Sequence, residues 1–438
     1  MMKITSFLLL FSITSAAFAQ KNNLKKQAEQ SISAIESKCI EWRRDFHQNP
    51  ELGNREFRTS SVIAAHLRKL GLEVKDSIAH TGVLGILKGG KPGPVIALRA
   101  DIDALPVTER GNLPFASKTK TTYNNIETGV MHACGHDAHT AILMAVAEVL
   151  SKHKNDLKGT IKFIFQPAEE GVPKGETGGA KQMVAEGVLK NPDAEVVFGL
   201  HTDALLPAGK ISYRPAGTMA SACDFKITIK GKQSHGSEPW NGVDPVVISS
   251  YIITQLQTIV SRNVNLRENP AAVTVGSIHS GIRFNIIPET AEMTGTIRAL
   301  TDADEKLMYG RVKDIAVNTA RSMGGEAIVE IPYTNYYPVT YNNPQLTEQM
   351  LGSIKEAAQQ NNVSLMPPKT GAEDFSYYAK EVPGFFFFLG GRPQHKTASE
   401  AAPHHTPDFF LDESSFVLGI KAFCFLVFDY ADAWKPVK

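Results

Sequence analysis

No strong bias of charge runs through this sequence. Its 46 basic and 45 acidic residues give a formal net charge of +1, and no basic run occurs in it. This absence argues against nucleic acid or anionic lipid as the main partner. Internal repeats and low-complexity linkers are also absent from the sequence. Hydrophobic residues make up 42% and charged residues 21%, which is typical of a soluble globular protein, and 438 residues predict two domains.

The first nineteen residues differ from the rest. Lys3 supplies a positive start, residues 4–18 are mostly apolar, and Ala17-Phe-Ala19 resembles a signal-peptidase site before Gln20. A membrane anchor is the alternative, but the segment is short for a span and carries several Ser and Thr residues. We therefore predict a signal peptide over residues 1–19, a periplasmic or secreted mature protein, and no membrane association after its removal. No other segment is expected to be long and apolar enough to cross a membrane.

The segment Met131–Ala141 concentrates the residues best suited to chemistry. Its three histidines, one cysteine and one aspartate precede a long apolar run that predicts a buried helix. Asp137 and Thr140 are candidate N-caps, which would place Cys134 and His136 in the turn before that helix. There the helix dipole would favour the Cys134 thiolate, and thiolate with imidazole is a common ligand pair for zinc. The alternative is a buried structural cysteine whose neighbouring histidines cap and hydrogen-bond.

Only four cysteines occur in the sequence. In an exported protein this number would suggest two disulfides, but a metal-binding Cys134 leaves three, namely Cys39, Cys223 and Cys424. Cys39 and Cys424 would meet if the two terminal helices pack together. Free, buried cysteine is our prediction for all three.

Four short apolar strands are predicted between helices, and acidic or histidine side chains follow each of them. Such strands indicate a mostly parallel sheet covered on both faces. Ligands bind beyond the carboxyl ends of strands in sheets of this kind. We expect these side chains to meet there: Asp101 and Asp103 after residues 95–98, Glu169 and Glu170 after residues 160–165, His201 after residues 196–200, and His404 and His405 in the loop after residues 384–389.

A different pattern occupies residues 218–334. A strand, a helix, two strands, a helix and a strand are predicted at residues 224–230, 244–261, 272–277, 291–298, 303–323 and 327–331. This βαββαβ order is the ferredoxin-like plan. Because strands of the earlier kind resume near Pro383, we predict that this domain is inserted into an α/β domain made of residues 20–217 and 335–438.

The candidate ligands are too many for one tetrahedral zinc ion with an open position, and they suit two close ions. Adjacent Glu169 and Glu170 cannot point the same way, so one can bind metal while the other faces the water on the ions. Asp103 would hold an imidazole or help to orient the bridge between the ions. The five candidate ligands are Cys134, His136, Glu170, His201 and His405.

Several long motifs resemble those of the aminoacylase-type metallopeptidases. The resemblance covers nearly the whole mature chain, and its closest branch is that of N-acyl amino acid amidohydrolases, hippurate hydrolases and auxin-conjugate hydrolases. It implies a zinc-exopeptidase-like catalytic domain with two metal ions and an inserted ferredoxin-like lid. The motifs are Arg99–Pro106, Met131–His139, Phe165–Glu170, Gly199–His201, Gly371–Phe375 and His405–Pro407.

The same resemblance implies roles for individual residues. It makes the five candidates metal ligands and Glu169 the general acid/base. His235 matches the lid histidine that stabilises the tetrahedral oxyanion. Asn285 and Arg298 match lid residues that hold the substrate's carboxylate, which suits a guanidinium through bidentate pairing. Because relatives often dimerise through the lid, we expect a homodimer, with His235 acting either in its own chain's site or in the partner's.

We therefore predict an exported amidohydrolase with two divalent metal ions that cleaves the amide bond of N-acyl amino acids or small peptide-like conjugates. A thiolate ligand favours zinc, and carboxylates also admit manganese, cobalt or nickel. One alternative is a carboxypeptidase or dipeptidase of the same family. Another is a non-catalytic binding protein with a structural metal, although such a protein would need neither Glu169 nor His235.

Overall fold

A computed structural model describes residues 4–435 of the chain, with side chains from residue 23 onward. The side chains of the predicted signal peptide, residues 1–19, therefore lie outside the description, and so do residues 1–3 altogether. The chain divides into two compact units. The large unit comprises residues 1–215, 342–366 and 378–438, and the small unit comprises residues 216–341 and 367–377.

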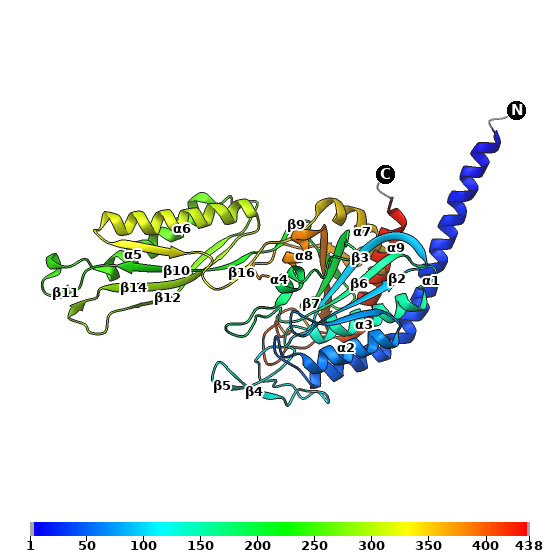
Figure 1. Cartoon of the computed structure of the whole chain (residues 1–438), viewed down its shortest axis with the longest axis horizontal. Helices are drawn as coiled ribbons and strands as arrows, with labels where there is room; N and C mark the ends of the chain where they lie inside the picture. Colours follow the sequence, from blue (N-terminus) through cyan, green and yellow to red (C-terminus); the bar gives the residue numbers. More distant parts are fainter. Residues whose placement is uncertain (1–3, 436–438) are drawn as a thin grey trace. The chain divides into compact units, whose positions relative to one another are not determined.

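An eight-stranded sheet forms the centre of the large unit (Figure 1). The four central strands, β6, β3, β7 and β19, run parallel to one another. Antiparallel pairs flank them on both sides, so the predicted mostly parallel sheet is confirmed. In spatial order the strands are β1 (Glu73–Ile78), β2 (Gly82–Lys88), β6 (Lys158–Gln166), β3 (Lys91–Asp101), β7 (Val196–Pro207), β19 (Gly384–Arg392), β8 (Ile211–Tyr213) and β18 (Val363–Leu365).

Alternate residues of the central strands form the core of the large unit. Phe163, Phe198 and Phe387 are fully buried in one cluster with residues of three long helices. On the other face, buried Lys162 donates from Nζ to two backbone carbonyl oxygens in the segment after α4 (Gly179–Ala185). Both faces of the sheet are therefore covered. The three long helices are α1 (Ile4–Gln48), α3 (His136–Lys152) and α9 (Phe416–Ala433).

Residues Glu413–Ala433, which include α9, are long and apolar enough to cross a membrane by length and composition. Our expectation that no segment beyond residue 19 would meet this criterion was therefore wrong. In the structure, 67% of the apolar window is buried inside the protein. Helix α9 packs against α1, α3 and α7 (Pro344–Ala358), and this packing explains why it is apolar on nearly every side.

Helix α2 (Phe57–Lys69) packs against β1 and β2. Its first turn is capped by Glu51, whose carboxylate accepts hydrogen bonds from Arg58 N at 3.0 Å and Thr59 N at 2.8 Å. A carboxylate at this end of a helix satisfies two otherwise unpaired N–H groups.

All four cysteines lie in the described part of the chain, and all four are free and buried. Cys39 on α1 and Cys424 on α9 belong to the same core, but they do not form the disulfide that we considered. Burial raises the pKa of both thiols, which keeps them protonated and unreactive.

The small unit contains a sheet in the order β12-β14-β10-β15, in which every neighbouring pair is antiparallel. Helices α5 and α6 cover one face of it (Figure 1). Phe225, Ile227 and Ile229 are buried against these helices, and Asp244 and Thr301 cap their first turns. The predicted βαββαβ order is confirmed by β10 (Ala222–Lys230), α5 (Pro245–Thr258), β12 (Ala272–Ser280), β14 (Thr290–Arg298), α6 (Asp302–Ser322) and β15 (Glu326–Glu330).

Shorter elements complete the described chain. One of them, the two-stranded pair β11 and β13, belongs to the small unit and carries His235. These elements are β4 (Lys120–Tyr123), β5 (Ile126–Gly129), β9 (Ala216–Met219), β11 (Ser234–His235), η1 (Pro239–Asn241), η2 (Ile259–Asn263), β13 (Ile286–Ile287), β16 (Tyr336–Tyr337), β17 (Thr340–Asn342), η3 (Gln360–Asn362), α8 (Ser376–Glu381) and η4 (Glu413–Ser415).

Candidate metal centre and active site

The carboxyl ends of the parallel strands bring the predicted polar residues together at one edge of the large sheet. β3 ends at Asp101, β6 ends just before Glu169 and Glu170, and His201 lies in β7. The loop after β19 reaches the same edge, where His405 N donates to a backbone carbonyl of the segment before α3 at 2.8 Å. Parallel pairing thus gathers groups that lie far apart in the sequence.

Helix α3 begins two to five residues earlier than the candidate N-caps suggested. Its N-cap is Gly135, and His136 is its first residue, so the prediction of a cap at Asp137 or Thr140 was wrong. Gly135 adopts φ +94°, and a Cβ there would lie 2.3 Å from the hydroxyl oxygen of Thr202. This turn needs a glycine because it is left-handed and tightly packed against β7.

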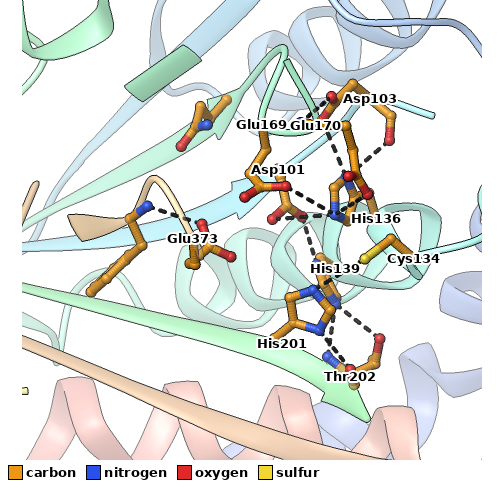
Figure 2. A network of polar contacts seen from close by, with 12 residues as sticks. Asp101, Asp103, Cys134, His136, His139, Glu169, Glu170, His201, Thr202 and Glu373 are labelled. Carbon is orange, nitrogen blue, oxygen red and sulfur yellow. Dashed lines mark hydrogen bonds and ion pairs between the residues drawn. The ribbon is translucent and has the colours of Figure 1, made fainter. Parts of the chain in front are cut away.

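All five predicted metal ligands converge, four of them labelled in Figure 2. The sulfur of Cys134 lies 3.4 Å from Nε2 of His201 and 3.3 Å from Nε2 of His405. Oε1 of Glu170 lies 3.2 Å from Nε2 of His405 and 3.9 Å from Nε2 of His136. Potential ligand atoms this close to one another are compatible with coordination of shared cations.

One buried atom of this cluster favours a cation at its centre. Among the residues that the structure describes, His136 Nε2 has no hydrogen-bond partner. A buried polar atom without a partner is costly, and metal coordination would remove that cost. The sulfur, imidazole and carboxylate donors are also those that bind divalent transition metals in proteins.

Asp103 orients two of the ligands. His136 Nδ1 lies 3.1 Å from Asp103 Oδ1 and 2.9 Å from the Asp103 carbonyl oxygen. Asp103 Oδ2 accepts from Glu170 N at 2.9 Å. With its proton on Nδ1, His136 turns the lone pair of Nε2 towards the other ligands, which is the arrangement expected of a residue that supports metal ligands.

Asp101 and His139 form a second set of supporting contacts beside the candidate ligands (Figure 2). Asp101 accepts from Arg99 Nη1 at 2.8 Å, and its other oxygen lies 2.6 Å from His139 Nδ1. His139 Nε2 in turn accepts from Thr202 N at 2.8 Å, so both ring nitrogens of His139 are engaged. Sequence reasoning gave His139 no role, although its position three residues after His136 on a helix could have suggested one.

The structure separates the roles of the adjacent histidines 404 and 405. Ala204 N donates to His404 Nε2 at 3.0 Å, and His404 Nδ1 lies 3.1 Å from the carbonyl oxygen of Cys134. Backbone groups therefore occupy both ring nitrogens of His404. His405, at φ +63°, turns Nε2 towards Cys134 and Glu170 instead, which favours His405 as the ligand.

A metal ion must displace protons from two of its candidate ligands, Cys134 and His136. Burial raises the pKa of the Cys134 thiol well above its ordinary value, and the nearby carboxylates of Glu170 and Glu169 raise it further. Our expectation that the helix dipole would favour the thiolate was therefore wrong for the metal-free site. Burial alone would lower the pKa of His136, but Asp101 and Asp103 raise it to about 10.

His201 is prepared for binding in its neutral form. Burial lowers its pKa well below the ordinary value, and His139 and His404 lower it further. His201 Nδ1 lies 2.6 Å from the Thr202 carbonyl oxygen. With the proton on Nδ1, the lone pair of Nε2 faces Cys134.

The three predicted lid residues belong to the small unit, which carries them at two different ends. His235 lies in β11, and Gly236 N donates to the Asn285 carbonyl at 2.9 Å. Asn285 precedes the start of β14, whereas Arg298 is the last residue of that strand. Eight residue steps of β14 span about 26 Å, so Asn285 and Arg298 of one chain do not meet within the small unit.

Arg298 keeps its positive charge in this position. Burial lowers the pKa of Arg298, but a guanidinium stays charged.

Metal binding at neutral pH should release at least two protons, because Cys134 and His136 must each lose one before they can act as ligands, and the contact with Glu170 raises the pKa of a third ligand, His405. The raised pKa of each group predicts that zinc affinity increases as the pH rises from 6 to 9. Calorimetric titration of metal-free protein with Zn²⁺, in buffers of different ionisation enthalpy, measures both quantities. Cys134→Ser should release about one proton fewer. A pH-independent affinity without proton release would contradict the assignment.

Residues 97–429 match the sequence model of peptidase family M20/M25/M40. Thermostable carboxypeptidase 2 of Saccharolobus solfataricus is 39% identical over 414 residues, covering 94% of this chain and 100% of the relative. N-acetylcysteine deacetylase of Bacillus subtilis is 37% identical over 393 residues, covering 89% of this chain and 96% of the relative. A solved structure of a Bacillus subtilis dinuclear metal-binding peptidase of the M20 family has a TM-score of 0.75 and 33% identity, covering 92% of this chain and 100% of that chain.

These similarities extend over nearly the whole chain and agree with the motifs, the fold and the cluster of ligand side chains. They identify an enzyme, which removes the alternative of a non-catalytic binding protein. The chain belongs to peptidase family M20/M25/M40, in its amidohydrolase branch, and is a metal-dependent hydrolase.

Proposed function

We propose that the large unit binds two divalent metal ions and hydrolyses the amide bond of N-acyl amino acids or small peptide-like conjugates. The observation that carries this proposal is the convergence of five ligand side chains around an unpartnered imidazole nitrogen, with Glu169 beside them. Thiolate and imidazole favour zinc, and the carboxylates also admit manganese, cobalt or nickel. Bound ions would lower the pKa of water and polarise the amide carbonyl. The ligands would be Cys134, His136, Glu170, His201 and His405.

Glu169 would act as general base and then as general acid. Its Oε2 lies 3.9 Å from His136 Nε2, close to the point where the ligand atoms converge. Its carboxylate would take a proton from water as the oxygen attacks the carbonyl carbon. The same proton would pass to the amide nitrogen as the C–N bond breaks. Asp103 would keep His136 and Glu170 oriented throughout.

His235 is prepared to donate a hydrogen bond to the oxyanion. Its ring is exposed, and Nδ1 accepts from Ser237 N at 3.1 Å. In the neutral ring this contact places the proton on Nε2. An N–H group held in this way stabilises the negative oxygen of the tetrahedral intermediate.

Arg298 would bind the carboxylate of the amino acid part of the substrate, with Asn285 from the second chain of the homodimer proposed below as a further polar contact. Among relatives, the N-acetylcysteine deacetylase supports cleavage of an acyl group from an amino acid. A carboxypeptidase or dipeptidase is the second candidate, and the 39% identical carboxypeptidase favours it. Both reactions cleave an amide next to a free carboxylate, so they share the same catalytic groups.

A substrate panel tests the reaction. Purified protein loaded with Zn²⁺, Mn²⁺, Co²⁺ or Ni²⁺ should release free amino acid from acetyl, benzoyl or indole-acetyl amino acids, and a chelator should stop the release. Glu169→Gln should lower kcat by a factor on the order of 10²–10⁴ and leave metal content unchanged, because Glu170 binds the metal.

Cys134→Ala is the matched comparison, since it should lose metal and activity together. Metal analysis beside the amine-release assay distinguishes the two variants. If the Glu169→Gln protein lost its metal, the roles of the two glutamates would be the reverse of those proposed, with Glu169 as the ligand and Glu170 as the acid/base. Rapid cleavage of unblocked dipeptides with no cleavage of acylated amino acids would favour the peptidase alternative.

We also propose a homodimer in which the lid completes the site of the partner. Because about 26 Å of β14 separates Asn285 from Arg298, the two residues of one chain cannot hold the same small substrate. Large apolar side chains surround the Asn285 end, where Trp240, Ile282 and Phe284 are 76%, 99% and 97% exposed. Such a patch, and the open edge of β12, are surfaces that a second copy would cover.

Mixing two inactive proteins tests this arrangement. Glu169→Gln and His235→Ala chains should together recover up to about a quarter of the wild-type activity, because random exchange puts half the chains into heterodimers with one intact site each. Light scattering and separately tagged chains confirm that heterodimers have formed. If heterodimers form but show no activity, His235 acts in the site of its own chain. If light scattering finds only monomers, the proposed dimer is wrong.

We further propose that residues 1–19 direct export and are then removed, so that the mature enzyme is periplasmic or secreted. Mass spectrometry of protein from the native host should find a mature N-terminus near Gln20. Protein expressed without residues 1–19 should keep full activity, because none of the proposed site residues lies there. An intact Met1 on membrane-bound protein would overturn the assignment.

A further inference from the structure

We propose that Glu56, a buried carboxyl group just before α2, positions the turn that carries Glu169 and so sets the rate of the chemical step. This inference rests on the proposed role of Glu169. Glu56 itself would touch neither metal nor substrate. It would act through the backbone of residues 167–170, and it is a positioning residue for that reason.

Two hydrogen bonds join Glu56 to its surroundings. Its Oε1 accepts from Ala168 N at 2.9 Å, and its Oε2 accepts from Thr81 Oγ1 at 2.5 Å. The residue is fully buried, so water does not compete for either contact. Burial and the nearby Asp103 raise the pKa of Glu56 to about 8. Near neutral pH the carboxyl group is therefore mostly protonated, and a neutral glutamine of similar shape can replace it.

The turn held by Glu56 has an unusual backbone. Ala168 adopts φ +50°, a left-handed conformation that residues with a Cβ rarely adopt and that persists only when the surroundings enforce it. The next residue is Glu169, and the one after it is Glu170, whose N–H is held by Asp103 at 2.9 Å. Glu56 on one side and Asp103 on the other thus fix the direction in which the two adjacent carboxylates leave the turn.

The segment around Glu56 is fitted closely to the same loop. A Cβ on Gly53 would lie 2.6 Å from the Gly171 carbonyl oxygen and 3.1 Å from Ala168 Cα. Asn54, at φ +59°, donates from Nδ2 to the Thr177 carbonyl at 3.0 Å. Residues 53–56 therefore clamp the loop at several points, although more than 100 residues separate the two segments in the sequence.

Three substitutions test the proposal in the metal-loaded enzyme with the N-acyl amino acid that it hydrolyses fastest. Glu56→Ala should lower kcat by a factor on the order of 10², the cost of misplacing a catalytic group by about 1 Å, with KM and metal content unchanged. Glu56→Gln should keep most of the wild-type kcat, since its amide oxygen can still accept from Ala168 N. Glu51→Ala is the matched control, because it removes a carboxylate that caps the same helix and should leave kcat unchanged.

Gly53→Ala provides an independent route to the same effect. It removes no polar group, but its methyl would push against Ala168 and Gly171, so it should also lower kcat more than KM. If Glu56→Ala fails to fold, the kcat and KM of Gly53→Ala still test the proposal. An unchanged kcat in Glu56→Ala, or a Glu56→Gln protein as impaired as Glu56→Ala, would overturn the positioning role. Failure of the proposed role of Glu169 would look different, because Glu169→Gln would then remain active whatever Glu56→Ala does.

Discussion

The large unit depends on one electrostatic constraint, which is the burial of several acidic groups at a single edge of its sheet. Asp101, Asp103 and Glu169 are almost completely buried, and Glu170 and the Cys134 thiol lie among them. Removing so many groups from water is costly unless cations or hydrogen bonds compensate them. The structure compensates Asp101 internally through Arg99 and His139. It leaves the Nε2 atom of His136 without a hydrogen-bond partner, and a bound metal ion would satisfy that atom.

The architecture solves this problem by keeping the ligands on rigid elements. Strand β7 supplies His201 and the first residue of α3 supplies His136, while the supporting Asp101 lies at the end of β3. The remaining positions depend on left-handed residues, since Gly135, Ala168 and His405 all have positive φ, which is strained at Ala168 and His405 but not at a glycine. Left-handed residues next to a site store strain that the surrounding contacts must hold. Hydrogen bonds such as those of Asp103 are therefore needed to hold these turns, and the candidate ligands that follow them, in place.

The two units divide the proposed work. The large unit holds the candidate metal ligands and Glu169, the proposed proton-transfer group, and the small unit holds residues proposed to recognise the substrate. Because β14 separates Asn285 from Arg298, the small unit is an extended support with polar residues at both ends. A long antiparallel sheet suits that task, since it places residues far apart with little flexibility.

The sequence by itself determined the fold class, the βαββαβ insertion and the convergence of the ligands. Apolar strands with polar ends and the family motifs are local features, and parallel pairing follows from them. Tertiary structure added the physical reason to prefer His405 over His404 as the candidate ligand, because backbone contacts from distant segments occupy the His404 ring. The raised pKa of Cys134 likewise comes from carboxylates far away in the sequence, which outweigh the local helix dipole. The position of Glu56 beside Ala168 had no sequence signal at all, since a single glutamate before a helix is ordinary until the fold buries it.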